Sequence, residues 1–164
     1  MGEESPLNGK AVLVVDDETD VLDTVEEMLP MCAVQKASDF DTALGLLRHN
    51  TYDLVILDIM GVRGFDLLQQ AVARGFVTIM LTAHAATTEA LRTSIKLGAA
   101  SFLPKDYMAE LKEVLEEILS GKGTRFWWQK SFDRTNEYFT KRLGSDWKEK
   151  DAFFKEFEKS LKGN

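Results

Sequence analysis

Short apolar runs alternate with amphipathic segments along residues 1–120, and this alternation restricts the possible folds more than any other feature. The apolar runs are rich in Val and Ile and lie at 11–16, 33–37, 53–58, 77–82 and 100–104. Runs of this length, bounded by Gly, Pro or polar residues, fit strands that are buried on both faces. Each run is followed by a segment whose apolar residues recur with the period of a helix. Five strands alternating with five helices predict an α/β fold, a doubly wound five-stranded parallel sheet.

Polar residues follow four of these five runs directly. Asp16 and Asp17 end the first, Asp58 the third and Thr82 the fourth, and Lys105 follows the fifth. Taken singly, each has an ordinary explanation, because acids and threonines cap helices and lysines lie on surfaces. The carboxyl ends of parallel strands, however, meet at one edge of the sheet, where such folds bind their ligands. We therefore expect these five side chains to lie together.

Three carboxylates in one place need a cation. At separations of about 5 Å each pair repels by roughly 3 kcal/mol at an effective dielectric constant near 20. Lys105 supplies one positive charge, and a site made only of oxygen atoms also selects a hard divalent ion such as Mg²⁺. A metal ion with open positions can receive phosphate oxygens, for which Thr82 and Lys105 offer further donors.

Four motifs in this order resemble the receiver domain of two-component response regulators. They are "VLVVDDE" (12–18), "DLVILDIM" (53–60), "IMLTAHA" (79–85) and "FLPK" (102–105), and the resemblance covers about residues 9–120. It implies the (βα)5 flavodoxin-like fold of that family. It also implies a bacterial, cytoplasmic signalling protein with no enzymatic output of its own.

The resemblance assigns a role to each acid. Asp58 looks like the residue that accepts a phosphoryl group from a histidine kinase or a histidine phosphotransfer protein. Asp17 and Asp58 resemble direct Mg²⁺ ligands, Asp16 acts mainly through water, and the backbone carbonyl of Met60 completes the set. Met60 and His84 also occupy positions that control the access of water in relatives, although loop packing explains Met60 better and solvent exposure explains His84 better.

The remaining roles concern the response to phosphorylation. By resemblance, Thr82 and Lys105 each bind a phosphoryl oxygen, and Phe102 occupies the aromatic switch position. The downstream protein partner is then expected to contact the face made by the fourth helical segment, the fifth strand and the fifth helical segment.

Two departures from the family pattern lie beside the site. In "DIMGVRG" Gly64 follows Asp58 by six residues, two fewer than usual, and the usual Met-Pro step is missing. Asp106 follows Lys105 where a proline, often with a cis bond, is common; a cis bond without proline costs about 2.5–4 kcal/mol, so we expect a trans bond or a strained loop. These departures keep open a receiver-like adaptor that works without phosphorylation. A Mg²⁺-dependent phosphohydrolase of the haloacid dehalogenase type is a further alternative, although its Asp-x-Asp pattern is not matched by Asp16-Asp17.

The charge of the chain changes sign near residues 120–123. Residues 1–120 hold 9 Lys+Arg and 20 Asp+Glu, a net charge of −11, whereas residues 121–164 hold 11 and 7, a net charge of +4. We therefore expect a disordered segment at 1–8, a receiver domain at 9–120 and a helical extension at 121–164. The single cysteine excludes an internal disulfide, and no apolar stretch approaches the ~20 residues that cross a membrane.

The extension is predicted to be a helical hairpin. Gly144 is typical of a helix end, and Asp146 with Glu149 forms a capping-box pattern that predicts the start of a second helix. Apolar side chains then recur every seven residues at Trp147, Phe154 and Leu161. So small a hairpin cannot bury its aromatic residues alone, so it must pack on the receiver, on a second copy in a homodimer or on a partner. Acids interleave with its basic residues, which argues against DNA as a ligand.

Overall fold

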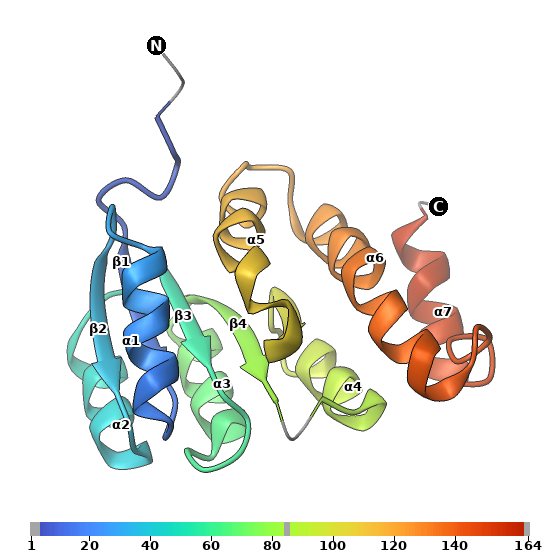
Figure 1. Cartoon of the computed structure of the whole chain (residues 1–164), viewed down its shortest axis with the longest axis horizontal. Coiled ribbons are helices and arrows are strands. Elements are labelled where there is room, and N and C mark those ends of the chain that lie inside the picture. Colours follow the sequence, from blue (N-terminus) through green and yellow to red (C-terminus); the bar gives the residue numbers. More distant parts are fainter. Residues whose placement is uncertain (1–3, 84–85, 163–164) are drawn as a thin grey trace.

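The computed structural model of the chain describes residues 4–83 and 86–162, and its centre is one parallel β-sheet (Figure 1). The strands stand in the order β2-β1-β3-β4-β5, and every pairing is parallel. They are β1 (Ala11–Val15), β2 (Ala33–Ala37), β3 (Leu54–Leu57), β4 (Val77–Thr82) and β5 (Ser101–Pro104). The predicted five-stranded doubly wound fold is confirmed.

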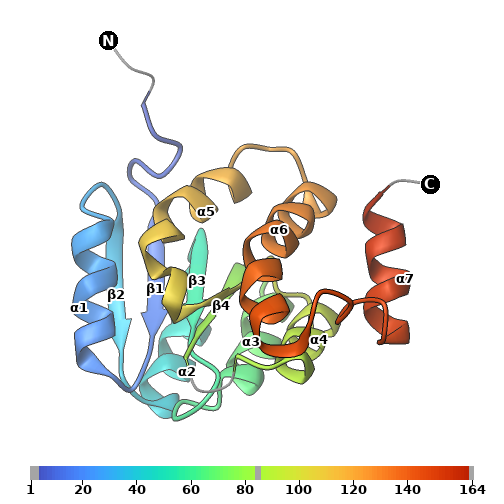
Figure 2. The same cartoon turned by 45° about the vertical axis from the view of Figure 1, so that its right-hand side comes forward.

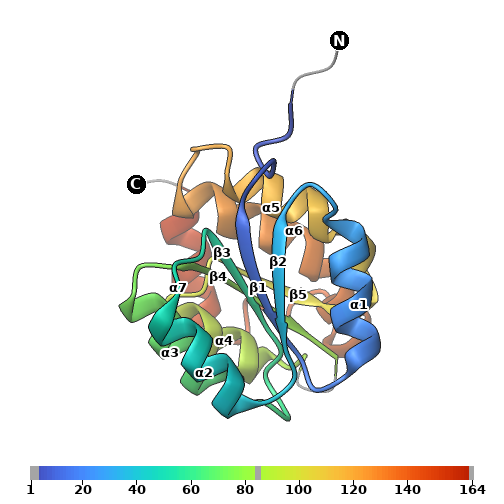
Figure 3. The same cartoon turned by 90° about the vertical axis from the view of Figure 1, so that its left-hand side faces the viewer.

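Five helices cover the two faces of the sheet, as Figure 3 shows with the sheet seen from its β2 side. Two lie on one face and three on the other. The first pair is α1 (Thr19–Met28) and α5 (Leu111–Ile118), and the second group is α2 (Phe40–His49), α3 (Gly64–Ala73) and α4 (Thr88–Lys96). Alternate strand residues feed the two cores: Val12 and Val14 pack with α1 and α5, whereas Leu13 and Val15 pack with the other group. Both faces of each central strand are therefore buried, as the apolar runs predict.

The connection after β5 is a short 3-10 helix, η1 (Lys105–Glu110), which leads into α5. The described residues contain no cis peptide bond, so the Lys105–Asp106 bond is trans. Of the two conformations expected from the missing proline, the trans bond is the one present. It does not displace Lys105, whose ammonium still reaches the carboxylates at the ends of β1 and β3.

The extension forms the predicted hairpin, which Figure 2 shows beside the sheet domain. Its helices are α6 (Thr124–Leu143), which ends at Gly144, and α7 (Ala152–Leu161). The predicted start of the second helix was wrong. Asp151, not Asp146, caps α7, because its side chain accepts hydrogen bonds from the N–H groups of Phe153 and Phe154. Trp147 therefore lies in the turn between the helices, where it is still buried.

The hairpin packs on the chain's own β5, α4 and α5, which is one of the three arrangements that its composition allowed. α6 lies next to β5 and α5, and α7 lies on the outer side of α6 (Figure 1). The contact of a downstream partner with the face made by α4, β5 and α5 stays a prediction, but in this structure the hairpin covers that face. The physical reason is that α6 and α7 bury their aromatic residues there, in one hydrophobic cluster with residues of β4, β5 and α4.

The amino-terminal segment also differs from the expectation of disorder. Residues 1–3 lie outside the described residues, but Leu7 is fully buried in the core beside α1 and α5. The hydroxyl of Ser5 donates a hydrogen bond to Glu116 of α5 at 2.8 Å. The buried leucine and this hydrogen bond hold the described part of the segment against the domain. No helix within the described ranges combines the length and the apolar character that a membrane span requires.

Candidate functional site

Asp58 stands at the carboxyl end of β3, the central strand of the sheet. Its side chain is only 8% exposed, and its Oδ1 accepts a hydrogen bond from the backbone N–H of Ile59 at 2.9 Å. The run Leu54–Leu57 is completely buried, and Asp58 is the next residue, at the carboxyl edge of the sheet. Asp58 is thus a nearly buried carboxylate with one oxygen held by the backbone and the other, Oδ2, directed towards Lys105.

Lys105 connects the ends of three strands. Its Nζ lies 2.7 Å from Oδ2 of Asp16, 3.1 Å from Oε1 of Glu18 and 3.8 Å from Oδ2 of Asp58. Asp16 ends β1, is 1% exposed and accepts a second hydrogen bond from the N–H of Glu18 at 2.9 Å. One ammonium group therefore balances two buried carboxylates and one exposed carboxylate.

Burial changes the protonation of these groups. Removal from water, and then the charge of Asp16, raise the pKa of Asp58 to about 6, although Lys105 opposes the shift. Burial likewise raises the pKa of Asp16. Burial alone would lower the pKa of Lys105, but its hydrogen bond to Asp16 and the charge of Asp58 raise it instead. The carboxylates outnumber the single ammonium group of Lys105, so the site favours the binding of a further cation.

The short loop after Asp58 is closed by backbone contacts. The N–H of Gly64 donates a hydrogen bond to the carbonyl of Ile59 at 2.9 Å, and Arg63 adopts a left-handed conformation with φ of 55°. Val62 is fully buried and anchors the loop. A Cβ on Gly64 would lie 1.9 Å from the carbonyl oxygen of Asp58, so only glycine permits this close return of the chain. The loop reaches α3 without the proline of the family pattern.

Asp17 and Met60 lie at the mouth of the site. Together with Glu18, Asp58 and Gly61 they line an open cavity beside the strand ends. Asp17 is exposed, and the Met60 side chain is 57% exposed. Gly61 has φ of 83°, and a Cβ there would lie 2.3 Å from Oδ2 of Asp17, so the loop backbone passes directly over this carboxylate.

The donor set fits Mg²⁺. Asp16, Asp17 and Asp58 each place one carboxylate oxygen within 4.8 Å of the others. The ligands are all oxygen atoms, which a hard divalent cation prefers, and the charge of Asp16 adds to burial in raising the pKa of Asp58. The three acids predicted to lie together do so; their roles as ligands, and that of the Met60 carbonyl, stay predictions.

Thr82 completes the edge of the site at the end of β4. It is fully buried, and its Oγ1 makes no hydrogen bond of good geometry within the described part of the chain, although the hydroxyl lies close enough to Asp58 to lower the pKa of that carboxyl slightly against the effect of burial. A buried hydroxyl without a partner costs about 1–3 kcal/mol, so a site that leaves one open has a use for it when a ligand is present. This is consistent with its predicted role as a donor to a phosphoryl oxygen.

Phe102 lies in the middle of β5, beside Met80 of β4 in the register of the sheet. It is fully buried in the cluster that also holds Trp128 and Phe132 of α6. Its role as a switch stays a prediction. His84, whose position invited a role in water access, lies outside the described residues.

Two residues of the site could not be predicted by the rule of strand ends. Glu18 pairs with Lys105, and Arg63 fixes the loop, with its guanidinium 4.1 Å above the ring of Phe40. The signal for Glu18 is present in the motif "VVDDE", whose third acid follows the strand almost as closely as the first two. Nothing in the sequence singles out Arg63, because a left-handed arginine stacked on a phenyl ring has no local pattern.

Comparison with known proteins gives a consistent result. The sequence model of the response regulator receiver domain matches residues 12–117. The two-component response regulator ARR14 of Arabidopsis thaliana is 35% identical over 124 residues, which cover 70% of this chain and 32% of that protein. The phosphate regulon transcriptional regulatory protein PhoB of Klebsiella pneumoniae is 30% identical over 122 residues, which cover 66% of this chain and 53% of PhoB. The chain thus spans about a third to a half of the length of these relatives.

Solved structures agree in fold. The receiver domain of NtrX from Brucella abortus superposes with a TM-score of 0.59 at 29% identity and covers 68% of this chain and 99% of that one. The response regulator TrrA from Thermotoga maritima, solved in complex with Mg(2+)-BeF, gives a TM-score of 0.58 at 29% identity, with 66% and 98% covered. Neither structure matches the whole of this chain.

Proposed function

The chain belongs to the response regulator receiver domain family, and from this premise we propose that it accepts a phosphoryl group on Asp58. The donor is a histidine kinase or a histidine phosphotransfer protein, and the modified chain signals through contacts with a downstream protein. The observation that carries the proposal is the position of Asp58: a nearly buried carboxylate, 3.8 Å from the ammonium of Lys105, with two further acids beside it.

The reaction is a transfer from nitrogen to oxygen. A carboxylate oxygen of Asp58 attacks phosphorus, the P–N bond to the donor histidine breaks, and the histidine takes up a proton. Asp58 must be ionised to attack, and with a pKa of about 6 it is mostly ionised at neutral pH. Lys105 and the unpaired hydroxyl of Thr82 are placed to bind phosphoryl oxygens, which neutralises charge in the transition state.

A metal ion would be held by Asp17 and Asp58, with Asp16 through water and the Met60 carbonyl at the loop. Bound Mg²⁺ screens the acids and polarises the phosphoryl oxygens. Family resemblance supports this cofactor, and the geometry of the three carboxylates supports it independently. The cytoplasmic location and the identity of the partners stay predictions.

Phosphorylation can be tested with a small donor. We expect incubation with acetyl phosphate and Mg²⁺ to give a phosphate adduct in intact mass measurement. Asp58→Asn should abolish the adduct, because an amide oxygen is a poor nucleophile. Asp41→Asn, which removes an exposed acid on α2, should leave it unchanged and serves as the matched control. Omission of Mg²⁺ should reduce the adduct strongly.

The same experiment separates the alternatives. No adduct on the unmodified sequence, at any donor concentration, would instead favour an adaptor that works without phosphorylation. Continuous release of phosphate from phosphate esters would point to a hydrolase. An adduct that persists in Asp58→Asn would place the acceptor elsewhere.

A further inference from the structure

The outer edge of β5 is covered by side chains of α6. β5 is the last strand of the sheet, so its outward N–H and C=O groups have no neighbouring strand. Trp128 donates its indole N–H to the carbonyl of Ala99 at 3.1 Å. The hydroxyl of Ser131 lies 3.3 Å from the carbonyl oxygen and 3.5 Å from the nitrogen of Phe102. Ser131 of the hairpin therefore occupies the outward backbone groups of Phe102 in β5, and Trp128 binds the chain just before that strand.

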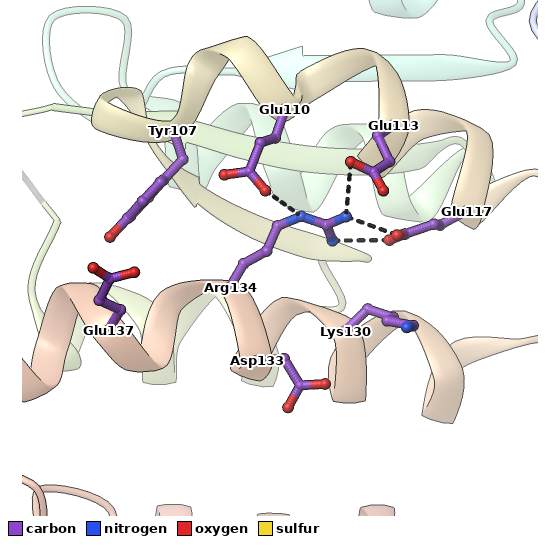
Figure 4. A pocket seen from close by; sticks show the side chains of 8 residues that line it. All are labelled: Tyr107, Glu110, Glu113, Glu117, Lys130, Asp133, Arg134 and Glu137. Carbon is purple, nitrogen blue, oxygen red and sulfur yellow. Dashed lines mark hydrogen bonds and ion pairs between the residues drawn. The ribbon is translucent and has the colours of Figure 1, made fainter.

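Arg134 holds the same helix to α5. Its guanidinium contacts Glu117 at 2.7 and 2.8 Å and Glu110 at 3.3 Å, and Glu113 lies 3.9 Å away. Figure 4 shows the arginine reaching from α6 across to these three glutamates. The side chain is only 11% exposed, so a bidentate pair in this position contributes more than a surface ion pair.

The second helix of the hairpin is tied to α4. Arg92 of α4 forms an ion pair with Asp151, the residue that caps α7, and its guanidinium lies 5.5 Å from the ring centre of Phe154. Lys96, one turn further along α4, lies 5.2 Å from the ring of Phe153. The hairpin thus contacts β5, α5 and α4 through different side chains.

The strand under the hairpin leads directly to the phosphorylation site. Phe102, which Ser131 contacts, stands three residues before Lys105 in β5 and η1. In the register of the sheet, Thr82 pairs with Pro104, the last residue of β5, which directly precedes Lys105. Lys105 now pairs most closely with Asp16, and a phosphoryl group on Asp58 would attract both Lys105 and the free hydroxyl of Thr82. Both movements act on the carboxyl end of β5.

We propose that the hairpin 124–161 is a built-in clamp on β5, and that occupation of the phosphorylation site loosens it. The inference rests on the proposed function of Asp58. Phe102 of β5 is fully buried in one cluster with the aromatic residues of α6. Because a close-packed interior contains little empty space, a shift of the strand must move the residues packed against it. The hydrogen bonds of Ser131 are already long, so they are the first contacts that a shift would break. Loosening of α6 then uncovers the face made by α4, β5 and α5.

Hydrogen exchange of the wild-type chain, measured with and without a bound probe, tests the clamp. The probe is beryllofluoride with Mg²⁺, which stands in for the phosphoryl group as a tetrahedral anion on the aspartate. We expect amide exchange in α6 to become about fivefold faster or more when the probe is bound, which is the lower end of usual coupling between sites. Exchange in α6 that is unchanged or slower with the probe bound would overturn the proposal. Asp58→Asn should abolish the response, because the probe then has no site.

Coupling must also act in the reverse direction. Arg134→Gln weakens the clamp and should therefore bind Mg²⁺ and beryllofluoride several-fold more tightly. Lys141→Gln is the control: it makes the same change of charge on the same helix, but among the described residues Lys141 pairs only with Glu137 within α6. Equal affinity in all three proteins would contradict the clamp.

The two proposals fail in different ways. If neither acetyl phosphate nor beryllofluoride modifies the chain, the function assigned to Asp58 fails and the clamp fails with it. If the probe binds and α6 does not respond, only the clamp fails.

Discussion

The carboxyl group of Asp58 is stabilised poorly when it is ionised, and this is a property of its position in the fold. Burial and the neighbouring Asp16 raise its pKa from 3.8 to about 6. A group whose pKa is higher in the folded state binds its proton more tightly there. The folded chain therefore loses stability as the pH rises through this range.

The first prediction follows from this shift. In the absence of metal, Asp58→Asn should raise the free energy of unfolding at neutral pH by on the order of 2 kcal/mol, because the uncharged amide avoids the cost of burying the charge. The gain should shrink as the pH falls towards about 4, where the folded state holds the proton and the charge no longer has to be buried. Urea unfolding in EDTA at several pH values measures it. Asp41→Asn, at an exposed position, should show no such trend.

The second prediction concerns Gly61, where the loop backbone crosses Asp17. Gly61→Ala should weaken Mg²⁺ binding at least several-fold, because the new methyl group would lie within the space of the Asp17 carboxylate. Gly75→Ala is the matched control: its φ of 78° is nearly the same, but nothing lies within 4 Å of the added atom. Calorimetric titration with Mg²⁺ should separate the two. Equal affinities would contradict the prediction that the loop backbone at Gly61 fixes the Asp17 carboxylate for Mg²⁺.

Reasoning from strand ends located most of the site because the rule is geometric. Every parallel strand delivers its last residue to the same edge, so Asp16, Asp58 and Thr82 could be brought together without coordinates. Lys105 followed from the same rule. The partners of these groups could not be found in this way, because which carboxylates an ammonium contacts depends on side-chain conformation.

Among the secondary-structure elements, α7 shows the limit of reading caps from sequence. Both Asp146 and Asp151 precede apolar residues with a helical period, and both fit a cap. Only Asp151 also reaches Arg92 of α4, so a tertiary contact decides between two local signals that are nearly equal. Such a contact is not visible until the hairpin is docked.

The third prediction tests that choice. Asp151→Ala should lower the stability by about 1–2 kcal/mol, because it removes the cap of α7. It also removes the ion pair with Arg92. Asp146→Ala should cost less than about 0.5 kcal/mol, since that side chain is half exposed and its one ion pair within residues 4–83 and 86–162 is with Lys150 at the surface. Thermal unfolding of the two variants provides the comparison. The reverse order would restore Asp146 as the cap.

The surface on which α6 packs was equally hard to predict. Its aromatic residues indicate that it packs on another surface, and the opposite net charges of residues 1–120 and 121–164 favour the receiver as that surface. Neither feature indicates that the contact is with β5. The decisive contacts are those of Ser131 with Phe102 of that strand and of Trp128 with the carbonyl of Ala99, two residues before it. Every strand offers the same backbone acceptors, so the sequence does not indicate which strand α6 contacts.

For the molecule as a whole, the hairpin and the sheet share one core. Phe132 packs against Trp128, Trp147, Phe154 and Phe157, and this group belongs to the same cluster as the residues of β3, β4 and α3. The extension is thus part of the folded domain and not an appendage on a linker. In the unmodified chain we expect both parts to unfold together.

The fourth prediction uses the distribution of tryptophans, all three of which lie in residues 121–164. Tryptophan fluorescence reports on the hairpin, whereas far-ultraviolet circular dichroism reports on every helix. The two signals should give the same midpoint in urea. An earlier fluorescence transition would show that the hairpin is a separate unit.

A variant of the residue at the centre of this aromatic group sharpens the test. Phe132→Ala should lower both midpoints together and cost about 3–5 kcal/mol, as expected for a buried phenyl ring. Phe126→Ala removes a partly exposed ring from the same helix and should have little effect.

The cover on β5 has a consequence for how this chain can be handled. A receiver cut at residue 120 would present a bare strand, a template on which strands of other molecules can grow into aggregates. Truncation at the receiver-domain boundary would thus produce an aggregation-prone fragment. Aggregation of that fragment would therefore not bear on whether the chain performs the signalling chemistry.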